Sequence, residues 1–181
     1  MFKSAKEIAY TGMMVALLIG AQMALSAVKG VEIVTAIFAL YCLVFGAIRG
    51  VAVATAFSLV RCLVFGFFPQ VVVLYLVYYN LFAVIVGLSG VLIKNKQELF
   101  KLIVLTIEAV VCVCAFTIID NLLNIYIWLD NPSDLVIKIY VTQSIPVMIG
   151  QMICAVITVP LFYYPLNKVF LVAKKTLKKS V

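Results

Sequence analysis

Residues Val71–Ile93 read VVVLYLVYYNLFAVIVGLSGVLI, a stretch of 23 residues without a charged side chain. A helix needs roughly 20 mainly apolar residues to cross the hydrocarbon core of a bilayer. The strands of a membrane barrel instead alternate apolar and polar residues over about ten positions. This run is continuously apolar over about twice that length, so it predicts a transmembrane helix.

Similar apolar runs make up most of the remaining chain. In order, the other five are Ile8–Val28, Ile33–Ile48, Val51–Phe67, Leu102–Leu129 and Ile139–Leu166. Short polar or glycine-containing breaks separate the runs. We therefore expect an all-α integral membrane protein in which residues 1–181 form a single domain of six transmembrane helices. The tight break at Arg49-Gly50 predicts a helical hairpin, and Pro146, Pro160 and Pro165 predict kinks in the last helix.

The composition supports a membrane location and excludes several functions. Of the 181 residues, 66% are hydrophobic and 12% are charged, against about 45–50% and about 25% in soluble domains. The chain has no histidine, which excludes histidine-based catalysis and imidazole metal sites. It also lacks the G-x-x-x-x-G-K-[ST] loop that binds nucleotide phosphates. We expect neither an enzyme nor a metal or cofactor site, and we interpret the five cysteines as small buried hydrophobic residues.

The basic residues predict the orientation of the chain in the membrane. Cytoplasmic loops are enriched in lysine and arginine. If the N-terminus is cytoplasmic and the chain crosses six times, eleven basic residues lie inside and two, Lys29 and Lys138, lie outside. The inner residues are Lys3, Lys6, Arg49, Lys94, Lys96, Lys101, Lys168, Lys174, Lys175, Lys178 and Lys179. Both termini are therefore predicted to be cytoplasmic.

With this orientation, most intramembrane polar residues fall in the outer half of the bilayer. Such residues are costly in lipid and usually face the bundle interior or a wet cavity, so we expect a substrate pocket open to the outside. Its candidate residues are Glu32, Arg61, Tyr79, Asn80, Asp120, Asn124, Trp128 and Gln143. The i, i+4 spacing of Asp120, Asn124 and Trp128 predicts one stripe along a helix. In the alternative interpretation, Arg61 pairs with Asp120 or Glu32 only to satisfy its charge, while the amides join helices.

The first helix carries a second pattern. Gly12, Ala16, Gly20 and Ala24 repeat every four residues, and such small residues let another helix approach closely. We interpret this small-residue ridge as a docking face for a partner helix. The alternative is ordinary packing inside the chain's own bundle.

Taken together, these features resemble the substrate-binding S components of energy-coupling factor (ECF) transporters. The stretch Val31–Gly46, VEIVTAIFALYCLVFG, also looks like the second span of uncharacterised members of that family. The resemblance implies that the first helix packs against a transmembrane coupling subunit, although Gly20 stands where the family motif has alanine. It also implies a site near the outer face that captures a vitamin or related small heterocycle. Two ATPase subunits would then drive toppling of the S component in a bacterial plasma membrane.

Other function classes stay open at this stage. An autonomous proton-coupled secondary transporter would use Glu108 or Asp120 as its titrating carboxylate, although internal repeats typical of such transporters are not evident. A structural subunit without a ligand and an intramembrane enzyme are further alternatives. Several vitamins are compatible with these residue types.

Overall fold

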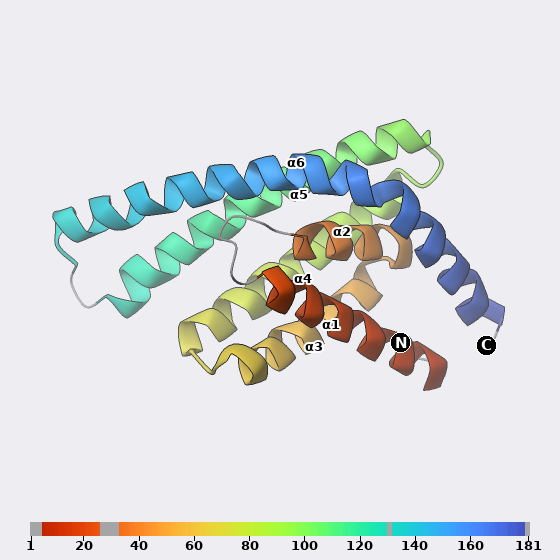
Figure 1. Ribbon diagram of the computed structural model, residues 1–181, viewed down its shortest axis with the longest axis horizontal. Helices are drawn as coiled ribbons and strands as arrows, with labels where there is room; N and C mark the ends of the chain where they lie inside the picture. Colours follow the sequence, from red (N-terminus) through yellow and green to blue (C-terminus); the bar gives the residue numbers. More distant parts are fainter. Residues whose placement is uncertain (1–4, 26–32, 130–131, 180–181) are drawn as a thin grey trace.

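The computed structural model describes residues 5–25, 33–129 and 132–179, except for the side chains of residues 128, 178 and 179. These ranges are almost entirely helical, which confirms the all-α prediction (Figure 1). The elements are α1 (Ala5–Leu25), α2 (Val34–Phe45), α3 (Ala47–Phe65), α4 (Pro69–Leu92), α5 (Glu98–Leu123), the π-helical turn η1 (Asn124–Trp128) and α6 (Asp134–Lys179).

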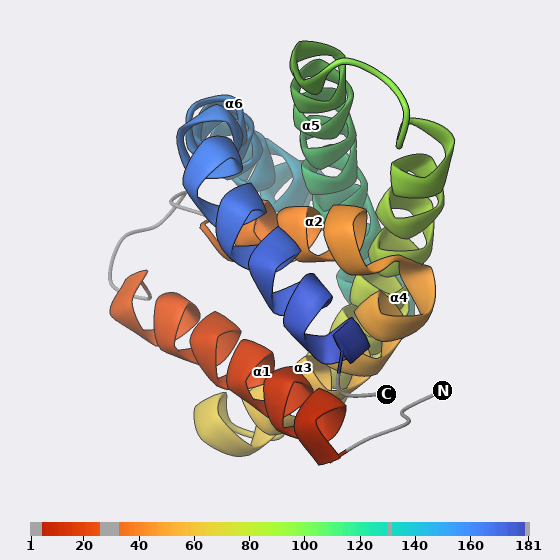
Figure 2. The ribbon, with the colours of Figure 1, turned by 90° about the vertical axis from the view of Figure 1, so that its right-hand side faces the viewer.

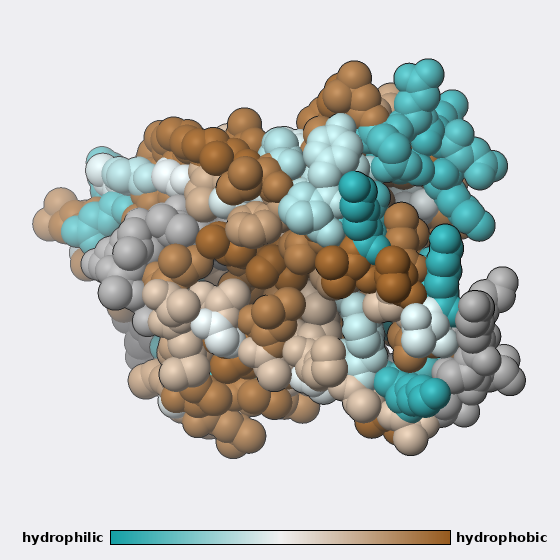
Figure 3. Space-filling view, turned by 45° about the vertical axis from the view of Figure 1, so that its right-hand side comes forward, coloured by the Kyte–Doolittle hydropathy of each residue, from teal (hydrophilic) through white to brown (hydrophobic). Residues whose placement is uncertain are grey.

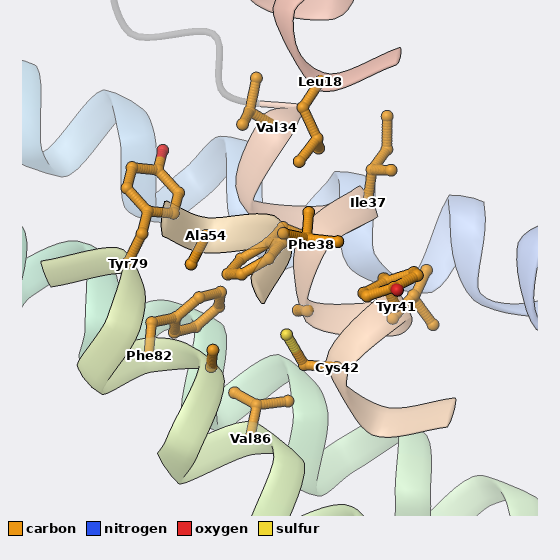
Figure 4. Close-up of a cluster of buried hydrophobic side chains, with 14 of the residues drawn as sticks. Leu18, Val34, Ile37, Phe38, Tyr41, Cys42, Ala54, Tyr79, Phe82 and Val86 are labelled. Atoms are coloured by element: carbon orange, nitrogen blue, oxygen red, sulfur yellow. The ribbon is translucent and has the colours of Figure 1, made fainter. Parts of the chain in front are cut away.

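Within the described ranges, five helices are long and apolar enough to cross a membrane, and α2 is shorter. Its 12 residues rise only about 18 Å at about 1.5 Å per residue, against a hydrocarbon core of about 30 Å. Eleven of those residues are buried. Figure 2 shows α2 inside the bundle, where it contacts each of the other five α-helices. Its residues Phe38, Tyr41 and Cys42 form part of the main hydrophobic core (Figure 4).

The chain turns between α2 and α3 at Gly46, and not at Arg49-Gly50 as the sequence suggested. Gly46 has a φ of +84°, a conformation that residues with a Cβ rarely adopt. Arg49 and Gly50 lie inside the first turns of α3. The prediction was wrong because Gly46 alone is enough to reverse the chain. Arg49 is therefore not needed to end α2.

Two glycines allow α4 to pack directly against the corner between α2 and α3. A Cβ placed on Gly87 would lie 2.3 Å from the backbone nitrogen of Ala47, and one placed on Gly90 would lie 2.7 Å from the carbonyl oxygen of Leu43. Backbones therefore meet without intervening side chains, as is common where membrane helices pack closely. This contact fixes the position of α4 relative to the corner.

Helix α6 is a continuous helix of 46 residues that contains Pro146, Pro160 and Pro165. It runs beside α5 and then bends toward the C-terminus in its last third (Figure 1). At about 1.5 Å per residue it is about 69 Å long, roughly twice the hydrocarbon thickness. It therefore extends well beyond one membrane crossing.

The bundle has two chemically different ends. At the first, which we call the basic end, α1 begins, α2 meets α3, α4 meets α5, and α6 ends (Figure 1). Hydrophilic residues gather mainly at this end in the space-filling view (Figure 3). At the opposite end, which we call the distal end, α1, α3 and α5 end and α4 and α6 begin. Of the predicted pocket residues, Arg61, Asp120, Asn124 and Gln143 lie in the distal part of the bundle, Tyr79 and Asn80 lie near the middle of α4, and Glu32 lies outside the described residues.

Candidate functional site

The distal part of the bundle contains two separate groups of polar side chains where the sequence predicted one pocket. The first group lines a cavity between α5 and α6, and the second surrounds Tyr75 at the meeting of α1, α3 and α4. We describe the two groups in turn, because their residues and chemistry differ.

The α5–α6 cavity has a volume of about 310 Å³. Its lining residues are Phe116, Thr117, Asp120, Asn121, Tyr140, Gln143, Ser144, Val147 and Gln151. Asp120 is the one ionisable acidic residue among them. Asn124 Nδ2 donates to Asp120 Oδ1 over 2.9 Å, and Asn121 Nδ2 donates across the cavity wall to Ser144 Oγ over 2.8 Å. Two of the predicted pocket residues, Asp120 and Gln143, therefore line this cavity, and Asn124 supports it.

Just beyond Asp120, α5 changes into a π-helical turn. The backbone nitrogen of Leu129 donates to the carbonyl of Asn124 over 3.1 Å, a separation of five residues instead of four. Asn124 and Trp128 are therefore joined by a π-helical turn and not by the α-helical turn that the sequence predicted. The side chain of Trp128 lies outside the described residues. Single π-helical turns in α-helices occur frequently at functional sites.

The second group is built around Tyr75 on α4. The guanidinium carbon of Arg61 lies 3.9 Å from the centre of the Tyr75 ring and 5.3 Å from that of Phe65. Gln22 Nε2 on α1 donates to the Tyr75 hydroxyl oxygen over 3.1 Å. Arg61 thus meets aromatic faces, which attract cations through the ring quadrupole.

The structure does not pair Arg61 with Asp120. In the part of the chain described, the salt bridges join Arg49 to Glu7 and Lys101 to Glu98. Glu32, the other predicted partner, lies outside the described residues. The interpretation of Arg61 as one half of an Arg61–Asp120 ion pair is therefore wrong for this structure.

Phe116 separates the two groups. Its ring meets the Tyr75 ring edge-on, with centroids 5.8 Å apart and an angle of 88°, and the same residue lines the α5–α6 cavity. Phe116 therefore contacts both groups.

Two predicted pocket residues have structural roles instead. Tyr79 is 2% exposed and packs its ring against Phe38 and Phe57 in the core (Figure 4). Asn80 accepts a hydrogen bond from Thr55 Oγ1 over 3.1 Å and donates to the carbonyl of Leu76 over 2.7 Å. Neither residue lines the α5–α6 cavity, since their positions on α4 direct them toward α2 and α3.

Three buried polar atoms lack a hydrogen-bond partner among the described residues. They are Gln22 Oε1, Arg61 Nε and Asn121 Oδ1. Each belongs to the distal part of a helix, on α1, α3 and α5 respectively. Buried polar groups are paired in the great majority of cases, and of these three residues Asn121 lines the α5–α6 cavity, where space for a further partner exists.

The sequence interpretation did not include several residues that line the cavity. Tyr140, Ser144 and Val147 are the clearest examples. A signal was present on α6, where Tyr140, Ser144, Val147 and Gln151 are spaced by three or four residues and share one face. This stripe was missed because most other residues of the run are apolar.

The small-residue ridge of α1 faces away from the rest of the bundle. Gly12, Ala16, Gly20 and Ala24 are exposed, and a Cβ placed on Gly12 or Gly20 would have no neighbour within 4 Å among the described residues. The helix instead buries a face that contains Met14 and Leu18. For the described part of the chain, the alternative of internal packing is therefore wrong.

Gly12, Ala16 and Gly20 of the ridge line one wall of an open apolar groove between α1 and α3, with a volume of about 850 Å³. Ala56 and Val60 form the opposite wall. The groove is open to the outside, and it has no charged lining residue. We call it the α1–α3 groove.

Within the described ranges, no three His, Cys, Asp or Glu side chains come together to hold a metal ion. Comparisons with protein-family models, curated proteins and solved structures found no match to this chain. The case for a function therefore depends on the residues and the geometry described above.

Proposed function

We propose that this protein is the membrane-embedded substrate-binding subunit of an ECF-type importer, which captures a vitamin or related small heterocycle from outside. The observation that carries the proposal is the α5–α6 cavity, where the Asp120 carboxylate lies beside Asn121, whose Oδ1 is buried and has no hydrogen-bond partner among the described residues. An unsatisfied buried polar group costs about 1–3 kcal/mol. A bound ligand with several polar atoms would recover part of that cost.

The α5–α6 cavity indicates the chemistry of such a ligand. A carboxylate, an amide and a hydroxyl, from Asp120, Asn121 and Ser144, lie beside the rings of Phe116 and Tyr140. A carboxylate accepts hydrogen bonds and favours positive charge, while aromatic rings favour flat ligands. The volume of about 310 Å³ is at the small end of ligand sites, about 300–1,000 Å³. A small flat ligand with ring or amino N–H groups fits these properties.

The orientation of the chain belongs to the same proposal. The described basic residues concentrate at the basic end, so this end faces the cytoplasm under the positive-inside rule. The chain then crosses a bacterial plasma membrane six times, with α2 as a short buried crossing and both termini cytoplasmic. The α5–α6 cavity lies toward the outside.

Energy for release would come from partner subunits. The chain has no nucleotide-binding loop, so a transmembrane coupling subunit and two ATPase subunits would supply the energy for ligand release. The exposed ridge of Gly12, Ala16, Gly20 and Ala24 supports docking of a helix from the coupling subunit, because small residues permit close approach. Binding itself would require no ATP.

The proposal is tested by identifying a small molecule that copurifies with the full chain, using mass spectrometry, and then measuring its affinity for variants. Asp120→Asn and Asn124→Ala should each weaken binding roughly tenfold or more, since hydrogen bonds to charged groups contribute about 1.5–3 kcal/mol. Glu108→Gln is the matched control, because this carboxyl is on the same helix but does not line the cavity. Unchanged binding in both site variants would contradict the proposal.

A second candidate, an autonomous proton-coupled transporter, is supported by Glu108 itself. This carboxyl lies in the middle of α5 and accepts a hydrogen bond from Ser89 Oγ on α4 over 2.9 Å. Uptake by the protein alone in proteoliposomes under a proton gradient, abolished by Glu108→Gln, would favour this candidate. The S-component proposal expects no uptake without partners and normal binding in Glu108→Gln.

A further inference from the structure

A second polar cavity lies at the basic end, far from the candidate substrate site. Its volume is about 320 Å³, and it is enclosed by the corner of α2 and α3, the end of α4, the start of α5 and the bent part of α6. The polar and charged groups around it include Lys94, Glu98, Lys101, Tyr163, Asn167 and Lys174. We call it the basic cavity. Nothing in the proposed substrate capture uses it.

Three lysines and one glutamate line the basic cavity, so its lining carries a net positive charge. Glu98 is engaged by several donors: Lys101 Nζ lies 2.8 Å from Oε1, and the Tyr163 hydroxyl donates to Oε2 over 2.7 Å. One carboxylate therefore offsets one lysine. Two positive charges, those of Lys94 and Lys174, remain without a carboxylate in the described part of the chain.

The two remaining lysines differ in how they are held. Lys174 Nζ donates to the carbonyl oxygen of Val44 in the last turn of α2, where the helix dipole favours a cation. The ammonium of Lys94 makes no hydrogen bond or ion pair with any described residue. An ammonium has three donors, so both lysines can donate to a further acceptor.

The surroundings of the basic cavity are apolar and exposed. Val91 and Leu171, which also line it, are 67% and 44% exposed. A ligand that is anionic at one end and apolar at the other would therefore find complementary surfaces here. Basic pockets between transmembrane helices bind anionic lipid headgroups in other membrane proteins.

We propose that the basic cavity binds the phosphate group of an anionic lipid, with Lys94 and Lys174 donating to its oxygens and the acyl chains lying along Val91 and Leu171. Glu98 acts as a positioning residue, because it holds Lys101 and Tyr163 at the wall. This site goes beyond the proposed substrate capture. Inorganic phosphate presents similar oxygens to the two lysines but has no acyl chains, so the experiment distinguishes the two sources.

The test is native mass spectrometry of the full chain released from detergent, titrated with phosphatidylglycerol or with phosphatidylcholine of the same acyl chains. Phosphatidylglycerol should bind preferentially. Lys94→Gln/Lys174→Gln should weaken its binding roughly tenfold or more. The matched control is Lys96→Gln/Lys168→Gln, which removes two charges from the same end but not from the cavity lining, and it should stay within about twofold of the wild type.

Three outcomes would overturn the proposal. The first is an equal loss in the control pair, since the attraction would then be a general surface effect. The second is displacement of phosphatidylglycerol by inorganic phosphate at equal concentration, which would assign the site to free phosphate. The third is full affinity in Lys94→Gln alone. This single variant breaks no recorded side-chain bond, so it remains informative even if the double variant does not fold.

Discussion

The guanidinium of Arg61 lies over the ring of Tyr75, with its central carbon 3.9 Å from the ring centre. The hydroxyl oxygen of the same tyrosine accepts a hydrogen bond from Gln22. One side chain of α4 therefore connects a cation of α3 to an amide of α1. This arrangement places the basic group against an aromatic face and away from the carboxylate of Asp120.

Two substitutions of Tyr75 should distinguish the stability contributed by its hydrogen bond from that contributed by its cation–π contact. Tyr75→Phe should lower stability by about 1 kcal/mol, the contribution of one hydrogen bond. Tyr75→Leu should lower it by about 2 kcal/mol more, because a desolvated cation–π contact is also lost. Thermal unfolding in detergent, followed by circular dichroism, measures both, and Tyr126→Leu at an exposed position is the control. Equal losses in the Phe and Leu variants would contradict a role for the ring.

The ion pair between Arg49 and Glu7 should matter more than the one between Lys101 and Glu98. The Glu7 side chain is 4% exposed, whereas that of Glu98 is 54% exposed. Removing one partner of a buried pair costs about 3–5 kcal/mol, while exposed pairs contribute about 0–1 kcal/mol. Glu7→Gln should therefore lower the unfolding temperature clearly, and Lys101→Gln should change it little. The reverse order would show that the α1–α3 connection is not stabilising.

Two glycines of similar helical context should respond in opposite ways to alanine. Gly87→Ala should destabilise the bundle, since the added Cβ would lie 2.3 Å from the backbone nitrogen of Ala47 and α4 would have to move. Gly12→Ala adds a Cβ with no described neighbour within 4 Å, and it should be neutral or slightly stabilising. Unfolding midpoints in detergent distinguish the two. Similar midpoints would mean that α4 tolerates a larger distance from the corner.

The α1–α3 groove is tested by filling it. Gly20→Leu should reduce copurification with a coexpressed ECF coupling module by roughly tenfold, because a bulky side chain prevents close helix approach. Ala9→Leu is the matched control, since this exposed α1 residue does not line the groove. Ligand affinity should be normal in both variants. Full copurification of Gly20→Leu would mean that the ridge is a lipid-facing surface and not a docking face.

Asn80 should affect stability and not ligand binding. Its amide already bonds to Thr55 and to the carbonyl of Leu76. Asn80→Ala should therefore cost about 1 kcal/mol of stability while the ligand affinity stays within about twofold. Isothermal titration with the copurifying ligand, compared with Asp120→Asn, provides the measurement. A loss of ligand affinity as large as that of Asp120→Asn would mean that Asn80 takes part in ligand binding.

Helix type and approximate helix boundaries could be predicted because each apolar run is a local property of the chain. The run Val71–Ile93, for example, corresponds to α4 at Pro69–Leu92, and no distant residue was needed to recognise it. The burial of α2 inside the bundle could not be predicted. Its run is as apolar as the others, and only its neighbours bury it.

The candidate site was predicted in part for the same reason. Depth along a helix follows from residue number, so Asp120 and Gln143 were correctly placed in one region. Direction around the helix axis depends on packing, and here α4 turns Tyr79 and Asn80 toward α2 and α3. The remaining polar side chains form two groups, one at the α5–α6 cavity and one around Tyr75, and Phe116 contacts both.

The sequence by itself determined that the chain is a helical membrane protein with its charges concentrated toward one end, because the free energy of placing a side chain in lipid depends mainly on that side chain. Only the tertiary structure decided which polar groups meet. Contacts between helices require a particular rotation and spacing of each helix, and these are set by close approaches such as Gly87 against Ala47. The ridge of α1 faces outward for this same reason, since the packing of α1 buries its Leu18 face instead.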